Sequence, residues 1–210
     1  KKHVFYDNIE FCEWLFEQKN YIGLAHNFKG YDSSFIMQYL LENYGENPRA
    51  SLPQVIAAGS KPLSITLQSV NLMDSLSFIP MPLKKFPKTF DLHELKKGYF
   101  PHKFNTIQNQ NYVGQYPNKE NYDSDYFSKE DKIEFDTWYS NVSNDTFDFK
   151  KEFEDYCWSD VQLLTHGCLA FRKIILEQDG VDCFRVGLTC ASMCNYIYRS
   201  KKKKKKSIGI

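Results

Sequence analysis

A short apolar segment, followed by a polar loop and then a helical pattern, constrains the fold of this chain most strongly. Residues 21–26, Tyr-Ile-Gly-Leu-Ala-His, are apolar, β-prone and bounded by polar residues. From Phe35 to Tyr44 the apolar residues recur at helical spacing. A buried strand that leads through a loop into a helix is the unit from which α/β folds are built. The sequence therefore predicts an α/β domain.

The remaining segments extend this pattern. Apolar residues three or four positions apart predict further helices over residues 5–16, 129–142, 147–177 and 188–198. We expect two or three strands between residues 54 and 76, including 64–67 and 70–73. Residues 80–87 contain three prolines, and residues 98–128 are rich in Asn, Tyr, Gly and Pro. Both stretches are predicted to be irregular, and a loop as long as the second is often functional.

The charge of the chain is unevenly distributed. The formal net charge is +1, but Lys201 to Lys206 supply six positive charges, and the other residues carry 21 basic against 26 acidic groups, a net of −5. An acidic body does not favour binding of duplex DNA through bulk charge. It fits better with carboxylates that gather around a divalent metal. The lysine run itself is interpreted as a solvated connector, with a nuclear-import signal or a phosphate contact as alternatives.

The cysteines and the apolar runs limit the cellular context. The six cysteines form no C-x-x-C pair, so we expect free thiols in a reducing compartment, with nucleus, mitochondrion and cytoplasm of a host all open. No run approaches the ~18 apolar residues of a membrane span, so no membrane partner is expected. Because the chain lacks an initiator methionine, we interpret it as a piece of a longer protein.

Two acidic motifs carry the candidate chemistry. Asp32 ends residues 26–32, His-Asn-Phe-Lys-Gly-Tyr-Asp, where a helix is predicted to start. Tyr156 and Asp160 stand four residues apart in Tyr-Cys-Trp-Ser-Asp, and therefore share one face of a helix. Two-metal hydrolysis of a phosphodiester needs carboxylates that hold the ions about 3.5–4 Å apart, and a phenol one turn away can orient the attacking water. Taken alone, Asp32 also fits a helix N-cap, and Tyr156 and Asp160 also fit a core tyrosine and a rim aspartate.

The pairing of these motifs, more than a hundred residues apart, resembles the second and third exonuclease motifs of family B DNA polymerases. Within that family it is most similar to the protein-primed branch of organellar, viral and transposon enzymes. The resemblance implies a ribonuclease-H-like 3′→5′ exonuclease domain with a mixed central sheet flanked by helices. It covers residues 1–198, without the first strands of that domain, and leaves residues 199–210 as a basic connector toward a polymerase palm.

The resemblance also implies roles for individual residues. Asp32 and Asp160 would hold Mg²⁺ or Mn²⁺, Tyr156 would position the water, and Lys97, or Lys96 as the alternative, would stabilise the transferring phosphate. The residues expected to hold the unpaired primer strand are Asn27, Phe28, Tyr31, Ser75, Leu76, Ile79 and Thr189. These residues also have ordinary structural alternatives, such as a loop asparagine, a turn serine, a solvated lysine and an N-cap threonine.

The expected function is proofreading within a DNA-directed DNA polymerase, with single-stranded primer DNA and primer–template as partners and a terminal priming protein as a further candidate. The first exonuclease motif, Asp-x-Glu, does not precede Asp32, because the pair Asp7 and Glu10 has the wrong spacing. The two-metal site is therefore expected to be incomplete and the chain alone inactive. The alternatives are a single-stranded-DNA-binding relic of a mobile element, and a stand-alone ribonuclease-H-like nuclease.

Overall fold

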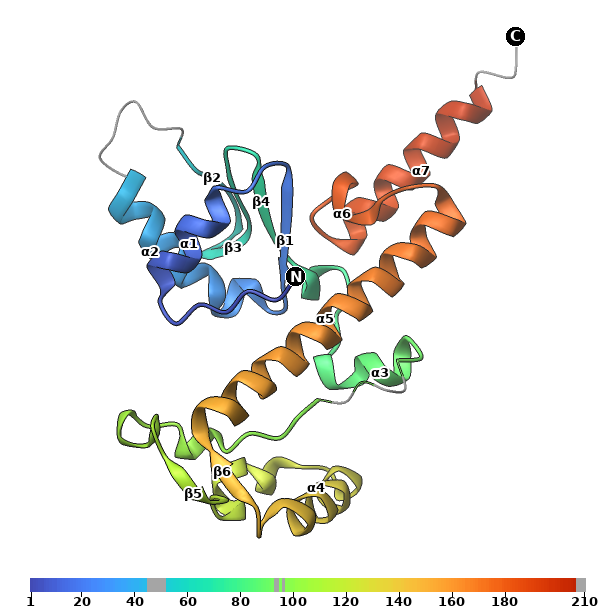
Figure 1. The fold of residues 1–210 in the computed structure, drawn as a ribbon. Helices are drawn as coiled ribbons and strands as arrows, with labels where there is room; N and C mark the ends of the chain where they lie inside the picture. The colour runs from blue at the N-terminus through green and yellow to red at the C-terminus, as the bar shows by residue number, and fades with distance from the viewer. Residues whose placement is uncertain (45–51, 93–94, 96, 207–210) are drawn as a thin grey trace. The chain divides into compact units, whose positions relative to one another are not determined.

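The computed structural model describes residues 1–44, 52–92, 95 and 97–206. It divides into two compact units, which are considered separately here. The first unit combines Lys1–Pro82 with Cys168–Ile210, and the second is the continuous segment Leu83–Gly167 (Figure 1). The predicted Lys96 lies outside the described residues.

A four-stranded mixed sheet organises the first unit. Its strands are β1 (Tyr21–Ala25), β2 (Gln54–Ala58), β3 (Lys61–Leu67) and β4 (Val70–Asp74), in the order β1-β4-β3-β2. β1 and β4 are parallel, whereas the β4–β3 and β3–β2 pairs are antiparallel. The prediction of an α/β domain with a mixed sheet is thereby confirmed.

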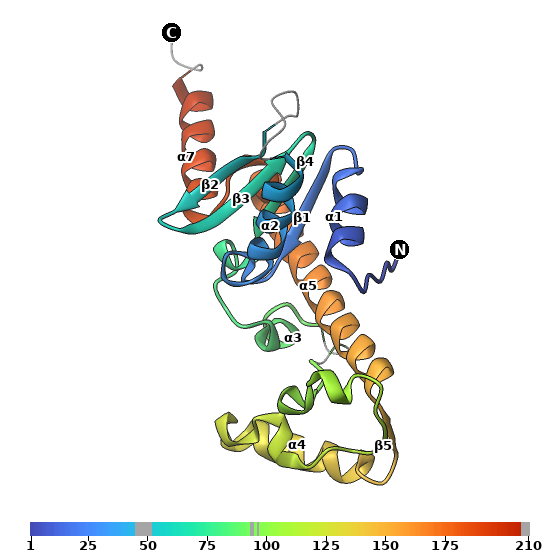
Figure 2. The same cartoon turned by 90° about the vertical axis from the view of Figure 1, so that its left-hand side faces the viewer.

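Two helices lie against this sheet (Figure 2), and apolar side chains pack between them and the strands. They are α1 (Asn8–Phe16) and α2 (Asp32–Tyr44). Their inward faces join the strands in one buried cluster that includes Leu15, Phe16, Ile36, Leu40 and Leu72. α1 begins at Asn8 because the Asp7 carboxylate accepts hydrogen bonds from the backbone N–H groups of Ile9 and Glu10, as an N-cap does.

The last of the C-terminal helices is longer than the sequence pattern predicted. α5 runs over Phe149–Asp179, α6 over Cys183–Val186 and α7 over Cys190–Lys206. The helix predicted to end at residue 198 therefore continues through the lysine run, since lysine is a good helix former and nothing in that run breaks a helix. α5 starts in the second unit and ends in the first.

The second unit is built around aromatic side chains. It contains α3 (Phe86–Thr89), α4 (Lys129–Val142) and the antiparallel pair of β5 (Val113–Gln115) and β6 (Thr146–Asp148). Residues 98–128, predicted to be irregular, hold β5 and several 3₁₀ turns. Aromatic side chains pack around these residues. Phe100 and Phe147 are 3 % and 1 % exposed. The Phe135 ring contacts Tyr99 edge to face and Tyr122 in a tilted arrangement.

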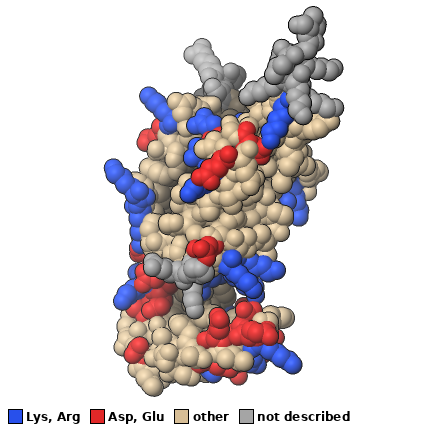
Figure 3. All heavy atoms as spheres, turned by 90° about the vertical axis from the view of Figure 1, so that its right-hand side faces the viewer, with Lys and Arg blue, Asp and Glu red and all other residues tan. Residues whose placement is uncertain are grey.

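The distribution of surface charge and the apolar character of the helices can be compared with the composition. On the face drawn in Figure 3, acidic and basic side chains are interspersed. Among the helices of the described segments, none combines the length and the apolar character that crossing a membrane requires.

Candidate functional site

The predicted residues of the first unit, apart from Thr189, come from one edge of the sheet. β1 and β4 are adjacent and parallel, and Ala25 at the end of one pairs with Asp74 at the end of the other. The chain leaves both strands at the same edge, which is where ligands bind in α/β folds. We call residues 26–31 the first loop and residues 75–81 the second loop.

Asp32 follows the first loop and is the first residue of α2. Its side chain is exposed, in the first turn of a helix, where a negative charge is favourable. Partial desolvation raises the pKa of this carboxyl, its own backbone N–H lowers the pKa, and the charge of Asp74 raises it further; the net pKa lies above its ordinary value. Because the charge of Asp74 disfavours the ionised form of Asp32, a nearby cation would stabilise that ionised form.

The first loop presents two of its three candidate strand-binding residues. Asn27 is exposed and adopts the left-handed conformation, with φ of 64°. Its side chain lies over Gly30, where a Cβ would come within 2.6 Å of Asn27 Nδ2. The Tyr31 ring is 67 % exposed and meets Phe35 edge to face at 5.1 Å.

Phe28 differs from the prediction that it or Tyr31 stacks on a base. Its ring is 1 % exposed and belongs to the core beneath the sheet edge. The 3₁₀ turn Phe28–Gly30 directs it inward, so its face is not available to a base. Tyr31 remains the aromatic candidate of this loop.

In the second loop, the predicted residues Ser75 and Ile79 are also buried, with exposures of 0 % and 2 %. The Ser75 hydroxyl donates to the carbonyl oxygen of Ala25 at 3.0 Å and lies 3.0 Å from His26 Nδ1. Their side chains pack the edge of the sheet rather than offering a surface to a strand. Leu76 is half-buried and is the one predicted side chain of this loop that reaches the surface.

Asp74 was not among the predicted site residues. It is 0 % exposed, and its carboxylate accepts hydrogen bonds from the backbone N–H groups of Asn27, Lys29 and Leu76. The signal that could have revealed it is an acidic residue directly after the apolar strand Val70–Met73, because a charge in that place must be compensated.

In the second unit the structure brings three predicted residues together. Tyr156 and Asp160 lie one turn apart on α5, and Lys97 Nζ is 3.3 Å from Asp160 Oδ2 and 5.5 Å from the centre of the Tyr156 ring. The next residue, Gly98, donates its N–H to Ser159 Oγ at 3.4 Å. A Cβ on Gly98 would lie 3.4 Å from Ser159 and 3.5 Å from Tyr156, which is ordinary van der Waals contact.

Neighbouring groups set the protonation of Tyr156 and Lys97. Burial raises the pKa of the Tyr156 phenol, Lys97 lowers it and Asp160 raises it, which leaves the pKa above its ordinary value. Burial lowers the pKa of Lys97, but Asp160 and Tyr156 more than offset that effect, so this pKa is also raised. At neutral pH the phenol keeps its proton and the lysine its charge. The Tyr156 ring is held by Phe100 and His102, with centroids 5.5 and 5.4 Å away.

One carboxylate oxygen of Asp160 has no hydrogen-bond partner among the described residues. Its Oδ2 faces Lys97, whereas Oδ1 is buried and has no hydrogen-bond partner within the described residues. A buried carboxylate oxygen without a donor is costly, and a hard divalent cation is a fitting partner for it. Across those same residues, no group of three or more His, Cys, Asp or Glu is arranged to hold a metal. The two carboxylates predicted as ligands lie in different units, Asp32 in the first and Asp160 in the second.

Thr189 caps a helix. Its hydroxyl oxygen accepts the Ser192 N–H at 3.1 Å, and Ser192 Oγ accepts the N–H groups of Leu188 and Thr189 at 3.0 Å. This reciprocal arrangement starts α7. The N-cap alternative therefore describes the geometry of Thr189, which remains half-exposed.

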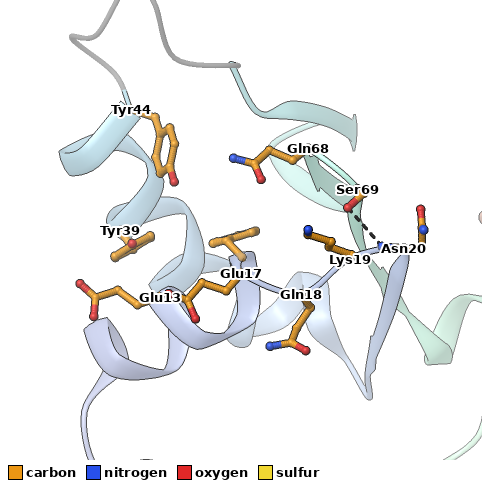
Figure 4. Close-up of a pocket in the computed structure, with 10 residues that line it drawn as sticks. Glu13, Glu17, Gln18, Lys19, Asn20, Tyr39, Tyr44, Gln68 and Ser69 are labelled. Atoms are coloured by element: carbon orange, nitrogen blue, oxygen red, sulfur yellow. Dashed lines mark hydrogen bonds between the residues drawn. The ribbon is translucent and has the colours of Figure 1, made fainter.

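A pocket of about 780 Å³ lies elsewhere in the first unit (Figure 4). Its lining includes Glu13 of α1, Glu17 directly after α1, Tyr39 and Tyr44 of α2, and Asn20 and Ser69. Asn20 and Ser69 immediately precede β1 and β4, so the pocket lies at the opposite edge of the sheet from Asp74. It contains none of the predicted site residues.

Comparison with known proteins identifies a family that this chain matches. The sequence profile of the family described as "DNA polymerase type B, organellar and viral" matches residues 12–210. A "Probable DNA polymerase" of Neurospora intermedia is 30 % identical over 184 residues, which cover 84 % of this chain and 19 % of the relative. A "Probable DNA polymerase" of Ascobolus immersus is 29 % identical over 191 residues, covering 84 % and 15 %. The chain thus spans less than a fifth of the curated relatives it matches, and no solved structure matches it.

Proposed function

Because the chain belongs to the organellar and viral type B DNA polymerases, we propose that it is part of a 3′→5′ proofreading exonuclease that acts during DNA replication. The proposal includes a ribonuclease-H-like fold for the domain and the protein-primed branch of the family, with a terminal priming protein as a partner of the whole enzyme. The α/β architecture and the mixed sheet support the fold assignment. Single-stranded primer DNA and primer–template are the proposed substrates.

The observation that carries the proposal is the group of Lys97, Tyr156 and Asp160. A protonated phenol and a carboxylate with one unpartnered oxygen lie one turn apart on α5, and the ammonium of Lys97 lies against both. Phosphodiester hydrolysis uses these three kinds of group, since it needs a cation ligand, a donor that orients water and a positive charge for the phosphate.

Asp160 Oδ1 fits a divalent cation, and Asp32 is the other carboxylate that we propose as a cation ligand. Mg²⁺ or Mn²⁺ at such a site supplies charge stabilisation for phosphate oxygens and a lowered pKa for bound water. Tyr156, whose raised pKa keeps its proton, donates a hydrogen bond to the attacking water. Lys97 keeps its charge and stabilises the negative charge that develops on the phosphate.

The first unit is proposed to hold the unpaired strand. Asn27, Tyr31 and Leu76 are the members of the predicted set whose side chains reach the surface at the sheet edge. Tyr31 offers a ring face on which a base can stack, a contact worth about 1–3 kcal/mol. Phe28, Ser75 and Ile79 support these loops from beneath. Thr189, at the start of α7, is proposed as a further polar contact to the strand.

Replacing Asp160 tests the proposal. In the full-length protein that carries this chain, Asp160→Ala should reduce Mg²⁺-dependent digestion of a mismatched primer 3′ end at least about a hundredfold, because a cation ligand is lost. Polymerisation on a matched primer should persist. The measurement is single-turnover digestion of a labelled primer, with Asp155→Ala as the control, since Asp155 is exposed on the same helix.

Digestion by Asp160→Ala at the wild-type rate would contradict the site assignment. Wild-type protein that binds single strands but digests none with Mg²⁺ or Mn²⁺ would instead support the non-cutting relic. Digestion by a protein that does not polymerise would support the stand-alone nuclease.

A further inference from the structure

Asp74 is a buried charge that the proposed chemistry does not use. Its side chain is fully inaccessible, and burial of a carboxylate is expensive unless hydrogen bonds compensate it. Among the described residues, the compensation comes from backbone groups: Oδ1 accepts from Asn27 at 3.0 Å and from Leu76 at 2.9 Å, and Oδ2 accepts from Lys29 at 3.4 Å.

The donors belong to both loops at the sheet edge. Asn27 and Lys29 lie in the first loop and Leu76 in the second, so one carboxylate ties the two segments together. A second connection runs alongside it: His26 Nδ1 is 3.0 Å from Ser75 Oγ, and His26 Nε2 is 3.1 Å from the carbonyl oxygen of Met81. The parallel pairing of β1 and β4 brings the two loops within reach of these side chains.

The hydrogen bonds of Asp74 distinguish its role from the cation-binding role proposed for Asp32. Backbone N–H hydrogens already occupy both oxygens of Asp74, and they carry the same sign of charge as a cation would. Asp74 is therefore suited to hold backbone rather than metal.

We infer that Asp74 is a positioning residue that fixes the first and second loops relative to each other, so that Asn27 and Leu76 present one preformed surface to single-stranded DNA. This inference rests on the proposed function for its ligand, but the anchoring of the loops can be measured without it. Preorganised loops lose less entropy on binding, so loss of the anchor should weaken strand binding more than it slows the chemical step.

The first measurement follows the loop itself. Trypsin can cut after Lys29, within the first loop, and after exposed Lys19, between α1 and β1. In the full-length protein, Asp74→Ala should accelerate cleavage after Lys29 at least about tenfold relative to cleavage after Lys19, because all three anchoring hydrogen bonds are lost. Asp7→Ala, which also removes a carboxylate that accepts two backbone N–H bonds in the same unit, should leave that ratio unchanged.

The second measurement follows the strand. With a single-stranded oligothymidylate as the probe, Asp74→Ala should raise KM for digestion at least about tenfold while kcat falls no more than about threefold, since contacts shared by ground state and transition state are lost. Asp74→Asn keeps an oxygen for Asn27 and Leu76 and should restore KM to within about threefold of wild type. Where the alanine variant does not fold, Asp74→Asn carries the test, with about a twofold rise in cleavage after Lys29 expected from the lost Lys29 bond.

The outcomes distinguish this inference from the proposed function. Unchanged cleavage after Lys29 in the folded variants overturns the inference. A loss of kcat at constant KM in Asp74→Ala also overturns it, because that result would make Asp74 a catalytic carboxylate. Wild-type protein without nuclease activity defeats the proposed function, while the proteolysis ratio and oligothymidylate binding still decide whether Asp74 holds the loops.

Discussion

Three aspartates of this chain differ in how their oxygens are satisfied, and that difference separates their roles. Asp160 has a buried oxygen without a hydrogen-bond partner among the described residues, and Asp74 has both oxygens bonded to backbone N–H groups. Asp182 instead pairs with arginine: Arg172 donates to both of its oxygens, at 3.1 and 2.7 Å. The first arrangement suits a cation, the second positions backbone, and the third stabilises the fold.

The Asp182 pair yields a pH-dependent prediction. The hydrogen bonds from Arg172 hold the pKa of Asp182 below its ordinary value, so the folded state favours the charged carboxylate. This stabilisation is present above the unfolded pKa, about 3.9, and is lost as pH falls through the lower folded pKa. Asp182→Asn should therefore reduce the free energy of unfolding by about 1 kcal/mol at pH 7, and by much less near pH 3.

Urea unfolding at both pH values measures this difference. Asp155→Asn, on an exposed position of α5, serves as the control and should change little at either pH. An equal loss for Asp182→Asn at pH 7 and pH 3 would show that packing, rather than charge, accounts for the effect.

At the scale of elements, α5 shows how one helix is fitted to its neighbour. Gly167 lies in this helix although glycine is a poor helix former. A Cβ on Gly167 would come within 2.1 Å of the Phe86 ring, and Phe86 is 0 % exposed. The glycine therefore lets α5 approach α3 closely, and its cost in helix propensity is offset by packing.

Gly167→Ala should accordingly destabilise the protein. Alanine gains about 1 kcal/mol in helix propensity, but overpacking of a buried ring costs about 1–3 kcal/mol or more, so we expect a net loss of about 1–2 kcal/mol. Thermal unfolding measures it, and Gly167→Ala combined with Phe86→Leu should recover part of the loss. A stabilised Gly167→Ala protein would show that Phe86 moves aside at no cost.

Sequence periodicity predicted the helices and strands of the chain well where each has one buried face. It placed β1, β4 and α5 nearly at their observed bounds and found the end of β3 but not its start at Lys61, because apolar spacing reports burial directly. It missed β5 and β6, each of three residues, since so short a strand leaves no periodic signal.

The predicted site was less accurate than the predicted elements, for a related reason. Tyr156, Asp160 and Lys97 do come together, since helical spacing fixes the first two. Loop side chains have no such spacing, so the sequence could not show that Phe28 and Ser75 point inward. Nor could it show that Asp74 gathers three backbone N–H groups, because that depends on the parallel pairing of β1 and β4.

At the scale of the whole molecule, each unit has its own buried cluster. Ile65, Leu67 and Val70 belong to the cluster of the first unit, and Phe100, Phe147 and Phe149 to that of the second. A unit with its own core can lose stability by itself.

Two core substitutions should therefore act in different parts of the chain. Ile65→Ala should cost about 2–5 kcal/mol and Phe147→Ala about 3–5 kcal/mol. Hydrogen-exchange mass spectrometry should show faster exchange in β1, β3 and β4 for the first variant, and in β5, β6 and residues 99–112 for the second. Equal acceleration of both regions by either variant would indicate a single cooperative unit.

The composition of the first unit from two separate stretches of chain has a consequence for biosynthesis. Strands β1 to β4 leave the ribosome early, but the Phe78 ring contacts Phe184 at 5.1 Å, which is translated only after the whole second unit. At about 5–20 residues per second, residues 83–167 take about 4–17 s to be made. During that interval the nascent sheet lacks part of its final packing, and we expect this to be the stage at which a chaperone binds the growing polypeptide.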